Sequence, residues 1–269
     1  MRHVTTTPIT SRSNDRLKEL RRLHERKHRE RSGLFVAEGE DLLSEALRFG
    51  VAPRAVFYDA DRLDEANPLL GRVPAGCELV PVAGAVLESA SALGSGSRVI
   101  AVCERPPQAV PSTEGLEAAV YLHEVADPGN VGTVLRSALA LTSALVILSP
   151  RCADPFGPKA VRASMGAVFG QPMLLGRSAG LEGARELLGD GWAAAALVPA
   201  SGVPLHELPQ DRRSLYCLGS ERLGLPPELA ASCDVVAHIP VRPGTESLNV
   251  AVTASICLYA TMVHRLSSA

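Results

Sequence analysis

Three segments of the sequence combine glycine or proline with polar side chains, each directly after an apolar run typical of a buried strand. They run from Asp127 to Arg136, from Leu218 to Pro226 and from Ile239 to Val250. In parallel α/β sheets, ligands bind in the loops at the carboxyl ends of the strands. Glycine permits close approach of the backbone to a ligand, and the polar residues can hydrogen-bond it. These segments are therefore where the sequence predicts chemistry.

The first segment places Asn130 where a helix cap is needed and Gly132 at the helix start. Arg136 follows about one and a half turns later and can reach back over the loop. An ordinary capped helix with a solvent-exposed arginine would show the same residues. Taken alone, this segment supports a functional site only weakly.

The other two segments are similarly open to a structural explanation. Gly219 and Gly224 suit a ligand-facing loop, but they also suit a simple turn. Ser247 stands where a helix cap is needed, and Asn249 falls in the first turn that follows. No strand is followed by a G-x-G-x-x-G fingerprint, which disfavours a dinucleotide-binding domain and a nicotinamide-dependent enzyme.

Together and in this order, the segments resemble the three signature motifs of the SpoU (TrmH-like) RNA 2′-O-ribose methyltransferases of the SPOUT superfamily. They match N-x-G-x-x-x-R, then G-S-E-x-x-G-L-P, then I-P followed by S-L-N-V. Residues 159–167 are similar to the family's K-x-x-R-x-S-x-G segment. Residues 9–11 and 35–39 look like the N-terminal RNA-recruiting domain of many members, so the resemblance covers nearly the whole chain. It departs at Ala251, where many relatives have serine, and at 94–97, which lacks a T-P-Q-G-like turn.

The resemblance implies transfer of a methyl group from S-adenosyl-L-methionine to a ribose 2′-hydroxyl. The catalytic residues it implies are Arg136, Asn130, Glu221, Ser247 and Asn249. The residues it implies for cofactor binding are Gly219, Ile239, Leu248, Leu218, Ser220 and Val241. Because arginine is always protonated, we expect Arg136 to lower the hydroxyl pKa and bind the neighbouring phosphate rather than act as a base. No metal is expected.

The elements that would position these residues follow from the hydrophobic pattern. Strands are expected at 33–39, 55–58, 79–82, 99–103, 118–123, 144–148, 192–197, 215–218 and 235–239. Helices are expected at 14–29, 40–49, 131–141, 158–168, 181–188 and 248–264. The alternation after residue 117 indicates a mostly parallel α/β sheet covered by helices on both faces. By resemblance this sheet carries a deep C-terminal trefoil knot, and the smaller N-terminal α/β domain resembles a ribosomal-protein fold.

The domain boundaries are expected at a proline-rich linker. Residues 1–104 would form the RNA substrate-binding domain, 105–117 the linker and 118–269 the knotted methyltransferase domain. The linker contains Pro106, Pro107 and Pro111 among small polar residues.

The charge is unevenly distributed along the chain. The formal net charge is −2, yet residues 1–31 carry a net +6 and the remainder −8. Leu17, Leu20 and Leu23 recur at helical spacing among these cations, which predicts an amphipathic helix with a phosphate-binding face. The expected RNA-binding residues are Arg12, Arg21, Arg22, Arg26, Lys27 and Arg29. A solvated helix surface would show the same pattern. With only 4% aromatic residues, RNA recognition is expected to use phosphate, ribose and shape.

Location and partners follow from what the chain contains. The sequence contains no run of 18 or more apolar residues, so no membrane span is expected. The N-terminus lacks the apolar core of a signal peptide. The six cysteines form no C-x-x-C pair, as expected of core residues in a cytoplasmic protein. By resemblance the protein would be a homodimer acting on ribosomal RNA, 23S in particular. Transfer RNA as substrate, or a catalytically silent RNA-binding knot protein, are the alternatives.

Overall fold

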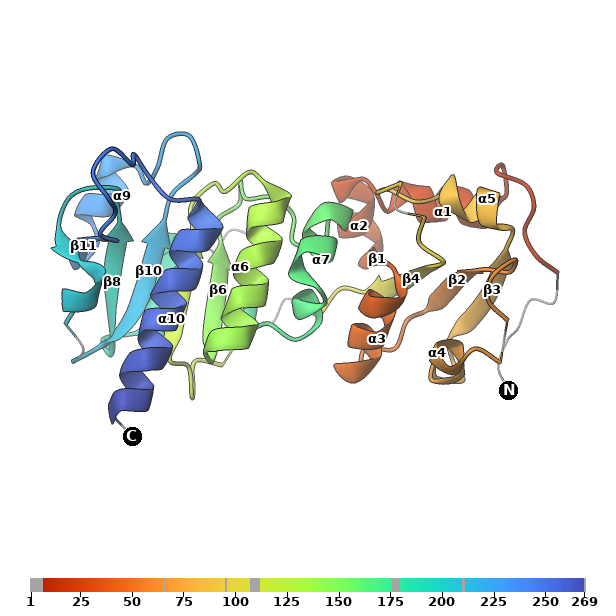
Figure 1. The fold of residues 1–269 in the computed structure, drawn as a ribbon, viewed down its shortest axis with the longest axis horizontal. Helices are drawn as coiled ribbons and strands as arrows, with labels where there is room; N and C mark the ends of the chain where they lie inside the picture. Colours follow the sequence, from red (N-terminus) through yellow and green to blue (C-terminus); the bar gives the residue numbers. More distant parts are fainter. Residues whose placement is uncertain are drawn as a thin grey trace. The chain divides into compact units, whose positions relative to one another are not determined.

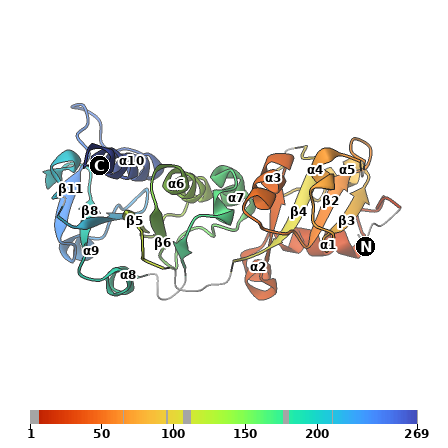
Figure 2. The ribbon, with the colours of Figure 1, turned by 90° about the horizontal axis from the view of Figure 1, so that it is seen from below.

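The computed structural model of the chain describes residues 7–64, 66–94, 96–106, 112–175, 180–209 and 211–268. The chain forms two compact units (Figures 1 and 2), the first of Met1–Pro107 with Asp154–Gly170 and the second of Gln108–Ala153 with Gln171–Ala269. Part of the expected linker, residues 107–111, lies outside the described residues. Residues 154–170, which fall within the expected methyltransferase domain, pack with the first unit.

The first unit contains a four-stranded mixed sheet in the order β1-β4-β2-β3. Its strands are β1 (Leu34–Glu38), β2 (Ala55–Asp59), β3 (Glu78–Val82) and β4 (Val99–Glu104). Its helices are α1 (Asp15–Arg22), α2 (Arg26–Ser32), α3 (Glu40–Arg48), α4 (Pro68–Gly71), α5 (Gly84–Glu88) and α7 (Pro158–Ser164). β4 is antiparallel to β1 and β2, whereas β2 and β3 are parallel. Leu17, Leu20 and Leu23 are buried against this sheet, as their spacing predicted.

The single helix expected over residues 14–29 is wrong, because the chain breaks into α1 and α2. The side chain of Asn14 caps α1, and Leu23 ends it. The guanidinium group of Arg29, one turn into α2, donates 2.8 Å hydrogen bonds to the carbonyl oxygens of Leu23 and His24. These bonds satisfy acceptors that a continuous helix would have paired internally.

The second unit contains a seven-stranded parallel sheet in the order β7-β6-β5-β10-β8-β11-β9. Its strands are β5 (Ala118–Leu122), β6 (Ala144–Leu148), β7 (Met173–Leu174), β8 (Trp192–Leu197), β9 (Val203–Pro204), β10 (Arg213–Leu218) and β11 (Val235–His238). Its helices are α6 (Pro128–Leu141), α8 (Leu181–Leu188), α9 (Pro227–Ala231) and α10 (Val250–Ser268). The predicted parallel α/β architecture is confirmed.

Helices cover both faces of this sheet. Leu181, Ala184 and Leu188 of α8 are buried in one cluster with sheet residues such as Tyr121 and Leu215. α6 and α10 lie side by side on the opposite face (Figure 2), where the hydroxyl groups of Ser137 and Ser255 are 2.7 Å apart.

Two helix boundaries differ from expectation. The helix predicted over residues 158–168 ends at Ser164, because Met165 and Gly166 adopt the left-handed conformation, with φ of 47° and 90°. A short 3₁₀ helix, η1 (Ala167–Phe169), follows. The C-terminal helix begins at Val250 rather than at Leu248.

One helix among the described residues, Val250–Ser267, is long and apolar enough to cross a membrane by length and composition alone, which is weak support for a span. This helix packs along α6 and buries Ala254, Cys257 and Leu258 completely. All six cysteines are free thiols, and five are buried in the two cores.

Candidate active site

The three segments that carry the predicted catalytic residues lie at one edge of the second unit's sheet. They follow β5, β10 and β11, and because these strands are parallel their carboxyl ends meet at the same edge. β5 and β10 are direct neighbours, and β8 separates β10 from β11. Segments far apart in sequence are thereby brought within side-chain reach of one another.

A hydrogen-bonded chain of side chains joins the three loops. The Nδ2 group of Asn130 donates to Oε1 of Glu221 at 2.8 Å. The Oδ1 atom of Asn130 accepts from Nδ2 of Asn249 at 3.0 Å. Each of these residues comes from a different loop, so the network fixes the relative positions of all three.

The residues that cap α6 and α10 determine which groups of Asn130 and Asn249 are available to the network. Asp127, not Asn130, caps α6, because its Oδ1 accepts from the backbone N–H of Asn130 at 2.8 Å. Asn249, not Ser247, caps α10, with its Oδ1 accepting from the N–H of Ala251 at 2.8 Å. The capping roles expected for Asn130 and Ser247 are therefore wrong, and the amide of Asn130 is left to bridge Glu221 and Asn249.

The carboxylate of Glu221 is held in its ionised form. Its oxygens accept from the backbone N–H groups of Ala126 and Asp127, both at 3.3 Å, as well as from Asn130. Burial acts to raise the pKa of Glu221, but the Asn130 and backbone hydrogen bonds outweigh it and lower that pKa below its ordinary value. The charge of Glu221 thus fixes which way the Asn130 amide points.

The remaining two predicted catalytic residues are exposed. Arg136 lies on α6 and Ser247 in the loop before α10. Within the part of the chain that the structure describes, neither makes a hydrogen bond to the Glu221–Asn130–Asn249 network. The guanidinium group of Arg136 and the hydroxyl group of Ser247 are therefore open to solvent.

A small pocket of about 70 Å³ lies at the same edge. Of the predicted cofactor-binding residues it is lined by Ile239, Val241 and Leu248, together with Ser247. Leu197–Pro199 at the end of β8, and Thr253 on α10, complete the lining and were not predicted. The pairing of β8 with β11, where Leu197 lies opposite Ala237, brings Leu197–Pro199 there.

The other three predicted cofactor-binding residues form the turn after β10. Leu218 is buried, and Ser220 and Gly224 exchange backbone hydrogen bonds of 2.9 and 3.1 Å. A Cβ atom on Gly219 would lie 1.9 Å from the carbonyl carbon of Gly224. No residue larger than glycine fits at position 219, so this glycine is a requirement of the tight turn.

The basic cluster of the first unit is only partly available to a ligand. Arg12, Arg22, Arg26 and Lys27 are exposed, and Arg21 is half-buried. The expected RNA-binding role of Arg29 does not fit the structure, because its side chain is 4% exposed and ion-paired with Asp154 at 2.7 Å. Its guanidinium group is committed inside the unit and does not face solvent.

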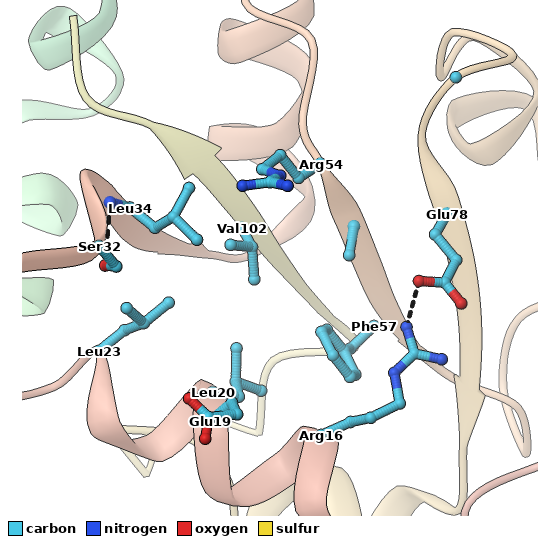
Figure 3. Close-up of a pocket in the computed structure, with 12 residues that line it drawn as sticks. Arg16, Glu19, Leu20, Leu23, Ser32, Leu34, Arg54, Phe57, Glu78 and Val102 are labelled. Atoms are coloured by element: carbon cyan, nitrogen blue, oxygen red, sulfur yellow. Dashed lines mark hydrogen bonds and ion pairs between the residues drawn. The ribbon is translucent and has the colours of Figure 1, made fainter. Parts of the chain in front are cut away.

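A groove of about 720 Å³ lies between α1 and the sheet of the first unit (Figure 3). Leu20, Leu23 and Phe57 contribute to its apolar lining. Its two basic side chains are both ion-paired, Arg16 with Glu78, as the dashed line in Figure 3 marks, and Arg54 with Glu104 at 3.8 Å. The mixed apolar and neutralised lining does not favour a strongly anionic ligand in this groove.

Among the described residues, no group of three or more His, Cys, Asp or Glu side chains could hold a metal ion.

Comparison with known proteins gives consistent matches along the chain. Residues 117–259 match the SpoU rRNA Methylase family, and residues 14–101 match the MRM3-like substrate binding domain. The 23S rRNA (guanosine(2553)-2′-O)-methyltransferase RlmP of Bacillus subtilis is 27% identical, over 93% of this chain and 97% of its own length. An uncharacterised tRNA/rRNA methyltransferase of Synechocystis is 33% identical, over 93% of this chain and 92% of its own. The structure of the SpoU methyltransferase AviRb from Streptomyces viridochromogenes in complex with AdoMet has a TM-score of 0.83 and 27% identity, covering 94% of this chain and 99% of AviRb.

Proposed function

The chain belongs to the SpoU rRNA methylase family, and we propose that it transfers the methyl group of S-adenosylmethionine to a ribose 2′-hydroxyl of 23S ribosomal RNA. The observation that carries this proposal is the hydrogen-bonded chain Glu221–Asn130–Asn249 beside a pocket lined by Ile239, Val241 and Leu248. All three family motifs thereby meet at one edge of the sheet, with side chains suited to aligning a hydroxyl group.

The pocket fits part of the cofactor. Its apolar lining suits an adenine ring. Ligand pockets usually enclose roughly 300–1,000 Å³, so a pocket of about 70 Å³ encloses only one moiety. The rest of the cofactor would lie along the exposed residues between Val241 and Ser247.

S-adenosylmethionine supplies a methyl group that is already activated for transfer. The residues of the site therefore have to align the ribose hydroxyl and manage its proton. Arg136 stays protonated, so we assign it to lowering the pKa of the hydroxyl and binding the adjacent phosphate. Asn130 and Asn249, fixed by Glu221, would orient the ribose, with Ser247 as an additional hydrogen-bonding group.

Ribosomal RNA is favoured over transfer RNA by the first unit. Residues 14–101 match the MRM3-like substrate binding domain, and two relatives that match most of this chain are named for 23S rRNA. The Synechocystis relative, named for either RNA, leaves transfer RNA as the second candidate. The bacterial relatives named for 23S rRNA support the further proposal that the protein acts in the cytoplasm.

We also propose a homodimer built on α10. Val252, Ile256, Tyr259, Val263 and Leu266 recur every three or four residues, which places them on one side of the helix. Four of these five are exposed, and Leu266 is 64% exposed. A continuous apolar stripe of this kind is typical of a protein–protein interface, and a second copy of this chain offers the same stripe. The trefoil knot implied by the resemblance stays a prediction.

Two experiments test the proposed function. Titration calorimetry with S-adenosylmethionine separates an active enzyme from a silent RNA-binding protein, which would not bind the cofactor. Methyl transfer from radiolabelled cofactor to ribosomal RNA stripped of protein, compared with bulk tRNA, then identifies the substrate. We expect saturable cofactor binding and label in ribosomal RNA. Label confined to tRNA would overturn the substrate assignment.

A further inference from the structure

The segment Asp154–Gly170 is firmly anchored in the first unit, although strands of the second unit precede and follow it in the chain. Asp154 forms a buried ion pair with Arg29 of α2, their side chains being 8% and 4% exposed. The rings of Phe156 and Phe169 lie 5.1 and 5.8 Å from that of Phe35 in β1. Both ends of the segment are thus held by contacts with the first unit.

Two glycines let this segment lie against α3 and the residue that follows it. A Cβ atom on Gly166 would lie 2.5 Å from Cβ of Glu45, and one on Gly170 would lie 2.2 Å from Cε1 of Phe49. Larger residues at either position would push the segment away. The position of α7 within the first unit is therefore fixed by packing.

This packing leaves one face of α7 exposed. Lys159 and Arg162 are three residues apart, so they lie on the same side of the helix, and both are exposed. Met165 follows three residues later and is 43% exposed. Its left-handed backbone is uncommon for a residue with a side chain, and such strain is typical of functional positions.

The two cations of this face carry unneutralised charge. Within the described part of the chain, neither Lys159 nor Arg162 makes an ion pair. Several cations of α1 and α2 do, namely Lys18 with Asp15, Arg22 with Glu19 and Arg26 with Glu30. α7 begins beside α2, since a Cβ atom on Gly157 would lie 3.5 Å from Nη2 of Arg29. The face of α7 therefore adds free positive charge to the first unit, on a helix whose start lies beside α2.

We propose that Lys159, Arg162 and Met165 form a docking surface for the RNA substrate. The two cations would bind backbone phosphates, and Met165 would pack against a ribose or an unstacked base. This inference rests on the proposed function, because it assumes an RNA substrate. It assigns the positioning of RNA to three residues that belong to the first unit. In the sequence they fall within residues 117–259, which match the SpoU rRNA Methylase family.

The test is RNA binding by the full-length chain, measured as salt-dependent dissociation constants for a transcribed 23S ribosomal RNA fragment. The variant is Lys159→Gln with Arg162→Gln. Its control is Arg62→Gln with Arg72→Gln, two exposed arginines elsewhere in the first unit. We expect the test variant to bind at least about fivefold more weakly at low salt, with a log–log salt slope lower by about 2. We expect the control to behave as the unmodified chain.

Two further measurements distinguish failure of the docking surface from failure of the proposed function. In methyl-transfer assays the test variant should raise KM for RNA with kcat little changed, and its affinity for S-adenosylmethionine should be unchanged. Met165→Ala should raise KM for RNA without altering the salt slope. Equal RNA affinity and slope in test and control variants would overturn the docking surface while leaving the proposed function intact. Absence of methyl transfer by the unmodified chain would instead overturn the proposed function.

Discussion

The side-chain amide of Asn130 donates a 2.8 Å hydrogen bond to the carboxylate of Glu221, 91 residues further along the chain. The acceptor is an ionised carboxylate, so the bond is stronger than one between neutral groups. It fixes the amide orientation, because only the nitrogen of Asn130 can donate to Glu221. The oxygen of Asn130 is then directed to Asn249.

This relationship predicts that Asn130→Asp is severely impaired. An aspartate cannot donate to Glu221 and places a second negative charge beside it. We expect single-turnover methyl transfer to fall by about 100-fold, as for a misaligned substrate. Glu182→Gln, on the exposed side of α8, is the control and should keep normal rates. Normal transfer by Asn130→Asp would show that the network does not align the substrate.

Glu221 also predicts a pH dependence of stability. Its pKa is lowered on folding, so the carboxylate contributes stability that is present above its ordinary pKa. That contribution is lost as pH falls through the lower, folded-state pKa. Urea unfolding between pH 3 and 7 should show this loss in the unmodified chain and less of it in Glu221→Gln. Identical pH profiles would contradict the assignment of the lowered pKa to this network.

Arg136→Lys tests the proposed use of a planar guanidinium. Lysine keeps the charge but cannot offer two parallel donors to a phosphate. We expect single-turnover methyl transfer to fall roughly 10- to 100-fold, while affinity for S-adenosylmethionine measured by calorimetry stays the same. Near-normal transfer by the lysine variant would mean that charge alone is sufficient at this position.

The α10 stripe predicts a dimer that a single charge can disrupt. Tyr259→Glu places a carboxylate in the middle of the exposed apolar stripe, where burial against a second copy would leave it unpaired. Sedimentation velocity at micromolar concentration should show a dimer for the unmodified chain and a monomer for this variant. Ser267→Glu, near the end of the helix, should remain dimeric. A monomeric unmodified chain would rule out the proposed dimer.

The buried Arg29–Asp154 pair predicts a large cost on removal of one partner. Arg29→Met leaves Asp154 buried without its counter-ion, and also removes the donors to Leu23 and His24. We expect a loss of about 3–5 kcal/mol in the free energy of unfolding by urea. Arg22→Met, which breaks an exposed pair with Glu19, should cost no more than about 1 kcal/mol. Similar losses for both variants would contradict the burial of Arg29.

The sequence predicted the parallel sheet because its strands are apolar runs that do not depend on distant contacts. β6, β8 and α8 have the predicted bounds. The break between α1 and α2 was missed because it depends on Arg29, whose partner Asp154 lies 125 residues away. Spacing alone could not show that this arginine is buried, since neighbouring arginines in the same cluster are exposed.

The predicted site residues were identified by motif, but their local roles were not. Asn130 and Ser247 have the chemistry of helix caps, and either role was compatible with the sequence. Asp127 and Asn249 take those roles because they stand directly before the first turn of each helix. Leu197 and Thr253 carry no motif, so only the pairing of β8 with β11 and the packing of α10 reveal them.

The central claim is tested most directly by mapping 2′-O-methylation in 23S ribosomal RNA after reaction with S-adenosylmethionine and the purified chain. The unmodified chain should introduce a methyl group at one ribose, and Asn130→Asp should leave that ribose unmodified under the same conditions. Absence of any new 2′-O-methyl group in ribosomal RNA, or a new methyl group on a base instead of a ribose, would contradict the account.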